Sequence, residues 1–164
     1  KIRKVIMQRV EFAKAREKIT KPAKLAVAVV KDETGKTNMI TLEWFMRTSI
    51  KPPMFAVSIG HTRYSYECFQ KFRKFNLMFP SKEMRETVRI CGSKSGRDTD
   101  KLELAQEEVF KGRHSDLPIF KNAVANFECV TTSQVRSGDH TIFVGEVKYS
   151  WINSEKELLL LKDL

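Results

Sequence analysis

Short apolar runs separated by turn residues dominate the hydrophobic pattern of this chain. Residues 25–31 form a valine-rich run, and a turn signal follows at residues 32–36. Residues 37–48 are dense in apolar, aromatic and threonine side chains, so the two runs together predict a β-hairpin. Further strands are predicted at residues 54–59, 75–79, 123–133 and 141–151, the last two joined by a turn at residues 137–139.

Helical spacing is confined to brief segments. Three aromatic residues recur at helical spacing within residues 64–72. Ser81, which directly follows a proline, predicts a capped helix over residues 82–90. The weaker patterns predict a peripheral helix or edge strand at residues 5–19, a mixed stretch at 102–122, and a short helix or extended arm at 154–164.

About six closely spaced strands with brief helices favour one mainly β domain, a barrel or sandwich, over a parallel sheet. With 164 residues, 41% of them hydrophobic, the chain can bury a sizeable core. We therefore expect residues 1–164 to form a single domain. No apolar run approaches the length of a membrane helix, so we expect no membrane association.

The net charge of +10 favours an acidic partner without identifying it. Basic residues are spread along the chain and interleaved with acidic ones, so a surface that attracts phosphorylated cofactors is at least as compatible as a nucleic-acid track. The three cysteines are widely spaced, with no Cys-x-x-Cys pair. This usage is typical of a reduced, cytoplasmic protein without a metal site.

Residues 91–101 form the most informative segment, because two glycines, two serines and three basic residues fall within it. Glycines let backbone N–H groups converge on a ligand, and Arg97 adds a planar fork that suits phosphate. No Gly-x-Gly-x-x-Gly motif or P-loop occurs, and the nucleophile elbow is excluded because Lys94 stands at its central position. The segment predicts an anion pocket at a helix end or, alternatively, a solvated connection.

Five runs, at residues 38–44, 52–59, 63–65, 91–101 and 138–147, carry a resemblance in their order and spacing. They resemble the flavin reductase-like family of FMN-binding split-barrel proteins, which includes flavoredoxin-like flavoproteins. The resemblance is strongest over residues 23–151. It implies a six-stranded antiparallel split β-barrel with Greek-key connections and a few short peripheral helices.

The resemblance also implies a homodimer with FMN at the subunit interface. The implied cofactor contacts are Asn38, Met39, Ile40 and Thr41 along the flavin ring and ribityl chain, Ser58, Arg63 and Ser65 around the phosphate, and Cys91, Ser95, Gly96 and Arg97 in the loop that closes over it. His140 would lie near the exposed flavin face, which makes it the candidate catalytic residue. Two simpler interpretations stay open: His140 can fix a hairpin turn, and Cys91 can be a small buried hydrophobe.

Three positions depart from the family pattern. Glu43 stands where many relatives carry a serine, and we expect it to point away from the cofactor or to pair with Arg47. Met78 replaces an asparagine, which predicts the loss of one polar cofactor contact. Ser65 replaces a threonine and keeps the hydroxyl.

The leading hypothesis is an FMN-binding flavoprotein oxidoreductase, specifically a flavin reductase that transfers hydride from NADH or NADPH to flavin N5. An FMN electron carrier that accepts electrons from a redox protein is the alternative within the same fold, and an oxygenase partner is also compatible. A different class is a non-enzymatic basic β-barrel that binds nucleic acid through exposed aromatic residues.

Overall fold

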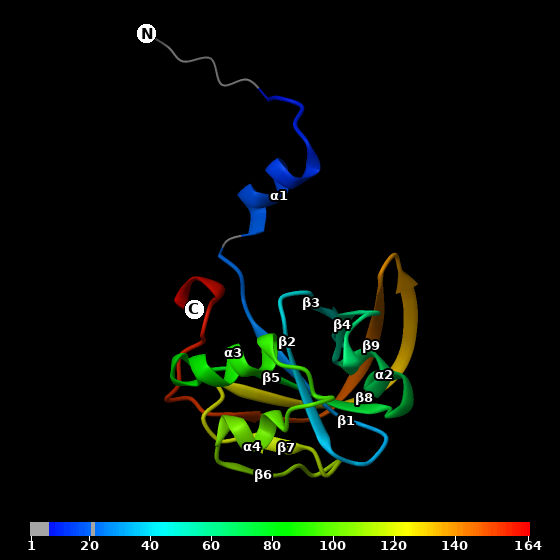
Figure 1. Cartoon of the computed structure of the whole chain (residues 1–164), viewed down its shortest axis with the longest axis vertical. Helices are drawn as coiled ribbons and strands as arrows, with labels where there is room; N and C mark the ends of the chain where they lie inside the picture. The colour runs from blue at the N-terminus through cyan, green and yellow to red at the C-terminus, as the bar shows by residue number, and fades with distance from the viewer. Residues whose placement is uncertain (1–6, 21) are drawn as a thin grey trace.

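The computed structural model describes residues 7–20 and 22–164, and antiparallel strands dominate it (Figure 1). Its elements are α1 (Phe12–Thr20), β1 (Ala26–Lys31), β2 (Thr37–Leu42), β3 (Phe45–Ser49), β4 (Met54–Gly60), α2 (Tyr64–Lys71), β5 (Lys74–Phe79), the 3₁₀ turn η1 (Lys82–Met84), α3 (Arg85–Ser93), α4 (Lys101–Ala105), β6 (Val109–Lys111), β7 (Pro118–Phe120), β8 (Ala125–Ser137), β9 (His140–Ile152) and the 3₁₀ turn η2 (Leu161–Asp163).

Seven strands form one sheet in the order β2-β1-β5-β8-β9-β4-β3, and every pair is antiparallel. Strand β4 lies near one end of this order, and β5 lies beside β1 near the other end. The connection between them contains α2. The strands β6 and β7 form a separate small hairpin. The predicted antiparallel, mainly β class is confirmed.

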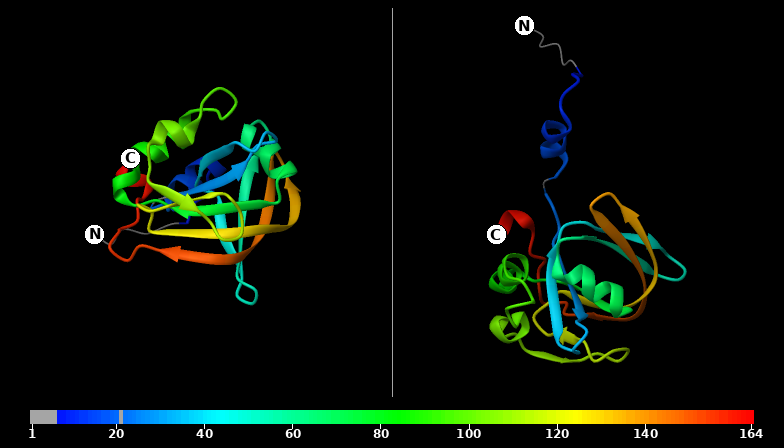
Figure 2. Two further views of the ribbon diagram at one scale, coloured as in Figure 1. Left: turned by 90° about the horizontal axis from the view of Figure 1, so that it is seen from below. Right: turned by 45° about the vertical axis from the view of Figure 1, so that its right-hand side comes forward.

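The sheet must curl, because its two end strands are neighbours along the chain. Only Glu43 and Trp44 connect β2 to β3, so the strand ends lie at most about 11 Å apart. A flat sheet would place the first and seventh strands about 29 Å apart at the usual strand spacing. We call this join of the two sheet ends the seam; Figure 2 shows the strands curling round to meet there.

Both faces of β1 are buried, which explains its unbroken apolar sequence. Val27 and Val29 belong to a cluster that includes residues of α3 and the C-terminal tail. Ala26, Ala28 and Val30 belong to a second cluster that includes residues of α2 and β9. A strand covered on both sides reads as a continuous hydrophobic run rather than an alternating one.

The structure corrects several sequence-based bounds. The predicted strand at residues 37–48 is two strands at opposite ends of the sheet, so the sheet has seven strands rather than six. Helix α3 continues to Ser93, whose hydroxyl donates to the Arg89 carbonyl, so the glycine-rich loop begins later than expected. Ser81 makes no capping hydrogen bond; its backbone instead pairs with Leu158 of the tail.

The weaker patterns are also resolved. Residues 102–122 contain most of α4 and the β6–β7 hairpin, while the tail makes two isolated bridges and ends in η2. Helix α1 replaces the uncertain element near the N-terminus and stands away from the barrel in Figure 1, although residues 5 and 6 lie outside the described residues.

Candidate functional site

A cleft of about 530 Å³ lies beside the seam. One wall comes from the end of β4 and the start of α2, and the other from β2, the end of α3 and the loop that follows it. These elements come from opposite ends of the strand order, so barrel closure builds the cleft. Its volume lies in the range of about 300–1,000 Å³ typical of ligand sites.

The α2 wall presents donors suited to an anion. Ser58, Thr62, Arg63 and Ser65 all line the cleft. Arg63 is the residue that precedes α2, and its side chain makes no capping hydrogen bond to this helix. The N–H groups and positive dipole end of α2 therefore act together with the hydroxyls and the guanidinium.

A buried amide sets the orientation of Ser65. Asn38 is 2% exposed, and its Nδ2 donates to Ser65 Oγ at 2.8 Å. Since the Ser65 oxygen accepts this bond, its own O–H group is available to donate elsewhere. The Asn38 side chain does not line the cleft, and its Oδ1 has no hydrogen-bond partner in the part of the chain that the structure describes.

The opposite wall is formed by the end of α3 and by the loop after it, whose backbone packs closely against β2. Thr41 Oγ1 donates to the Val88 carbonyl at 2.8 Å, which fixes this hydroxyl against α3. Gly92, Ser95 and Gly96 continue the wall. A Cβ atom on Gly96 would lie 2.1 Å from Asn38 Oδ1, so the loop approaches β2 more closely than any side chain would allow.

Lys101 lines the cleft from a position between β2 and α3. Its side chain is 4% exposed, and its Nζ donates to the carbonyls of Met39 at 2.7 Å and Cys91 at 3.0 Å. Burial lowers the pKa of this ammonium group below its usual value. Burial likewise raises the pKa of the Cys91 thiol to about 12, so this cysteine is an inert buried residue at neutral pH.

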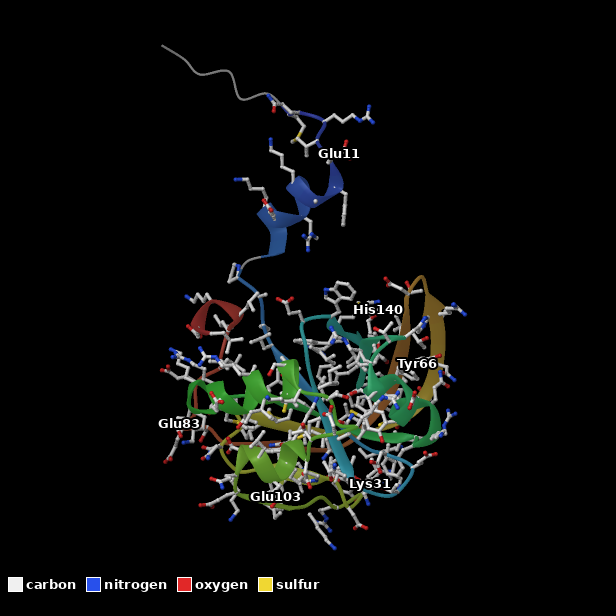
Figure 3. All side chains as sticks on the ribbon, in the orientation of Figure 1. Glu11, Lys31, Tyr66, Glu83, Glu103 and His140 are labelled. Carbon is white, nitrogen blue, oxygen red and sulfur yellow. The ribbon has the colours of Figure 1, made fainter. Side chains whose placement is uncertain are left out.

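His140 also lines the cleft, and Figure 3 shows it near the upper end of the barrel. Its Nδ1 is 2.6 Å from Asp139 Oδ1, and this hydrogen bond lowers the pKa of the Asp139 carboxyl. The ring packs against Trp44 with centroids 4.6 Å apart. Glu43 and Arg16 of α1 also line the cleft.

Most of the sequence-predicted residues meet at this cleft: Ile40, Thr41, Ser58, Arg63, Ser65, Cys91, Ser95, Gly96 and His140. Asn38, Met39 and Arg97 do not line it. Asn38 lies behind Ser65, and the Met39 side chain is fully buried in the core, where its carbonyl holds Lys101.

Arg97 is directed toward α2 instead of the cleft. Its guanidinium pairs with Glu67 at 2.6 Å and lies over the Tyr64 ring, 4.8 Å from the centroid. The loop thus uses its arginine to fasten itself to the helix. A composition rich in glycine, serine and arginine indicates an anion loop, but it does not reveal which basic side chain is already paired.

The structure also locates two of the residues that depart from the family pattern, Glu43 and Met78. Glu43 is one of the residues that line the cleft, and it forms no ion pair with Arg47 within the described ranges. Met78 is fully buried in the core and is absent from the cleft lining. Replacing the expected asparagine there therefore removes no side chain from the cleft.

Several lining residues escaped the sequence analysis, namely Arg16, Thr62, Lys94 and Lys101. Thr62 lies one residue before the matched run at residues 63–65, so extending that run would have included it. Lys101 ends the glycine-rich segment, but nothing in its local sequence signals a buried ammonium group. Arg16 belongs to a separate helix and gave no signal.

Residues 7–20 and 22–164 contain neither a metal-binding cluster nor a membrane-spanning helix. In these ranges no group of three or more histidine, cysteine, aspartate or glutamate side chains could hold a metal ion. The same residues contain no helix that is long and apolar enough to cross a membrane.

The comparisons with known proteins agree with this architecture. The family profile described as the flavin reductase like domain matches residues 20–163. An uncharacterized protein of Archaeoglobus fulgidus is 32% identical over 112 residues, which are 68% of this chain and 63% of that protein. The chain thus spans less than two thirds of the length of this relative.

Two solved structures are similar over nearly the whole chain. An FMN-binding protein from Thermus thermophilus, with bound 1-cyclohex-2-enone, has a TM-score of 0.77 at 29% identity and covers 99% of this chain and 94% of its own. The NADH:FAD oxidoreductase of Streptomyces globisporus has a TM-score of 0.79 at 22% identity, covering 89% and 85%, which shows the shared fold. With the profile matched over residues 20–163, this chain belongs to the flavin reductase like family.

Proposed function

We propose that the cleft binds FMN and that the protein is an oxidoreductase that accepts hydride from NADH or NADPH. The observation that carries the proposal is the convergence of cations, hydroxyls and the N-terminus of α2 on one cleft beside the seam. Such a set matches an anionic group such as the phosphate of FMN.

The residues present fit this cofactor on two counts. Lys101 is a nearly buried ammonium group without a carboxylate partner in the described chain, which calls for an anionic ligand. Ser65 has its oxygen occupied by Asn38 and its O–H available to donate. In this proposal Arg63, Ser58 and Ser65 hold the phosphate, while Ile40 and Thr41 lie along the ring.

When bound, FMN supplies the hydride chemistry, and the protein supplies binding, orientation and electrostatics. Asp139 holds the Nδ1–H group of His140, so Nε2 is the acceptor in the neutral ring. His140 can then hold or release a proton at Nε2 within the cleft lining. Trp44 packs against this ring and restricts its movement.

FMN is favoured over FAD by the solved structure with the higher sequence identity of the two, the Thermus thermophilus FMN-binding protein at 29%. NADH is supported by the Streptomyces globisporus enzyme, which is an NADH:FAD oxidoreductase. These properties belong to those proteins, and for this chain they are part of the proposal.

We also propose a homodimer in which a second copy covers the cleft mouth. Trp44, Met46 and Ile50 are 58%, 62% and 77% exposed on or beside the edge strand β3. Apolar side chains gathered at a sheet edge favour contact with another protein surface. The expected redox or oxygenase partner and the cytoplasmic location stay predictions.

The test is an absorption titration of the purified protein with FMN and with FAD, followed by anaerobic addition of NADH or NADPH. We expect FMN to bind and its bands to bleach with one or both nucleotides. Bands that persist, but bleach with a reduced redox protein, would indicate the electron-carrier alternative. Absence of flavin binding would refute the proposal, and salt-dependent binding of single strands would then favour the nucleic-acid alternative.

A further inference from the structure

Lys101 occupies an unusual position for a lysine. It begins α4, and its side chain runs inward to the wall between β2 and the end of α3. Only 4% of the residue is exposed, yet it contributes to the lining of the cleft. An ammonium group is strongly hydrated in water, so burying it requires partners that replace that hydration.

The protein replaces this hydration incompletely. An ammonium group has three N–H donors, and two are taken by the carbonyls of Met39 and Cys91. Both acceptors are neutral. No carboxylate lies within 4.0 Å of Nζ among residues 7–20 and 22–164, and no third acceptor is present there.

The positive charge of Arg63 also acts on the Lys101 ammonium group. Arg63 from the opposite wall is close enough for its charge to oppose protonation of Lys101, in addition to the larger effect of burial. Two cations thus face one cleft, and one of them is nearly excluded from water. A buried, unpaired charge is strongly unfavourable, and an anion in the cleft would relieve both cations at once.

We propose that Lys101 is a binding residue whose third N–H donates to an anionic oxygen of the ligand, as the buried counter-charge of this site. The inference rests on the proposed flavin function. Two sources can provide such an oxygen: the phosphate of FMN, and the ring of a flavin, which gains negative charge when it is reduced. The chemistry recognised is the same in both cases.

The main variants are Lys101→Met, which removes the charge, and Lys101→Gln, which removes the charge but keeps donors for the Met39 and Cys91 carbonyls. Lys101→Arg keeps the charge. Lys74→Met is the matched control, because Lys74 also donates to a backbone carbonyl, that of His114 at 3.0 Å, but does not line the cleft. Circular dichroism and thermal unfolding verify that each variant folds.

The readout is the Kd of each protein for FMN and for riboflavin, which lacks the phosphate, measured with oxidised and with reduced ligand. Loss of a hydrogen bond to a charged group predicts about 10- to 100-fold weaker binding of the anionic form. If the phosphate is the partner, Lys101→Gln weakens FMN and leaves riboflavin unchanged. If the reduced ring is the partner, the reduced forms of both ligands weaken and the oxidised forms do not.

The outcomes separate the inference from the function on which it rests. A wild-type protein that binds neither flavin overturns both. A wild-type protein that binds FMN while Lys101→Gln and Lys101→Met bind all four ligand forms equally well overturns the inference alone. A uniform loss for all four forms also overturns it, because Lys101 would then be only a structural tie between β2 and α3.

Discussion

The close packing of Gly96 against β2 gives a sharp test of how the cleft is held together. A Cβ atom at this position would lie 2.1 Å from Asn38 Oδ1 and 3.1 Å from Tyr64 Cδ2. Asn38 cannot turn aside easily, because its amide is buried and donates to Ser65. Gly96→Ala must therefore displace the loop or break the Asn38–Ser65 hydrogen bond.

The size of the effect follows from the crowding. Overpacking of a well-filled interior costs about 1–3 kcal/mol. For a domain of this length, each kcal/mol shifts Tm by about 2–4 °C, so Gly96→Ala should lower Tm by roughly 2–12 °C. We also expect weaker FMN binding, since the displaced groups orient the Ser65 hydroxyl.

Gly92→Ala is the matched control on the same wall. Its Cβ would meet Thr41 Cβ at 3.5 Å, which is ordinary contact, and Gly92 lies within α3. Alanine is favoured over glycine by up to about 1 kcal/mol inside a helix, so this change should leave Tm unchanged or raise it. Thermal unfolding followed by circular dichroism compares the two. A Gly96→Ala protein as stable as Gly92→Ala would refute the rigid contact between the loop and Asn38.

Three further predictions concern charged groups. Arg63→Gln should weaken FMN binding by about tenfold or more, whereas Arg97→Gln should weaken it less because a carboxylate of α2 already holds Arg97; fluorescence titration gives both Kd values. Glu128 is 1% exposed and accepts hydrogen bonds from two backbone N–H groups and the Trp151 indole, so Glu128→Gln should cost about 1–3 kcal/mol in urea unfolding. Partial burial acts to raise the pKa of the Asp32 carboxyl. Hydrogen bonds from its own turn have the larger combined effect, so this pKa lies below its usual value. The resulting stability is present above the ordinary carboxyl pKa and is lost as pH falls through the lower folded value, so Asp32→Asn should flatten the acid side of the stability profile.

The main strands could be predicted because each buries one or both of its faces against apolar side chains, which leaves a recognisable hydrophobic pattern in the sequence. The run at residues 25–31 is uninterrupted since both faces of β1 are covered. The division of residues 37–48 was not predicted, because Glu43 and Trp44 include none of the glycine, proline or asparagine residues that signal a turn. At these two residues the chain passes from β2, at one end of the strand order, to β3, at the other end. This step depends on closure of the barrel, which is a property of the whole sheet.

The candidate site was predictable to the extent that its residues lie in short runs of recognisable order. Most of these residues line one cleft, although they come from distant parts of the chain. The pairing of individual side chains was beyond the sequence: Arg97 meets Glu67, and Asn38 supports Ser65 from behind. Lys101 was missed because its burial depends on where the chain places Met39 and Cys91.

The seam has a consequence for the internal motions of the protein. Strands β2 and β3 each have one hydrogen-bonded neighbour in the sheet, while β5 and β8 have two. Local opening at the seam breaks fewer ladder bonds than opening at the centre, so its amides should exchange with solvent fastest. A molecule held between the two walls would brace ends of the sheet that no ladder joins. Cofactor loading should then slow amide exchange in β2 and β4, which lie far apart in the strand order, and leave the central strands unaffected.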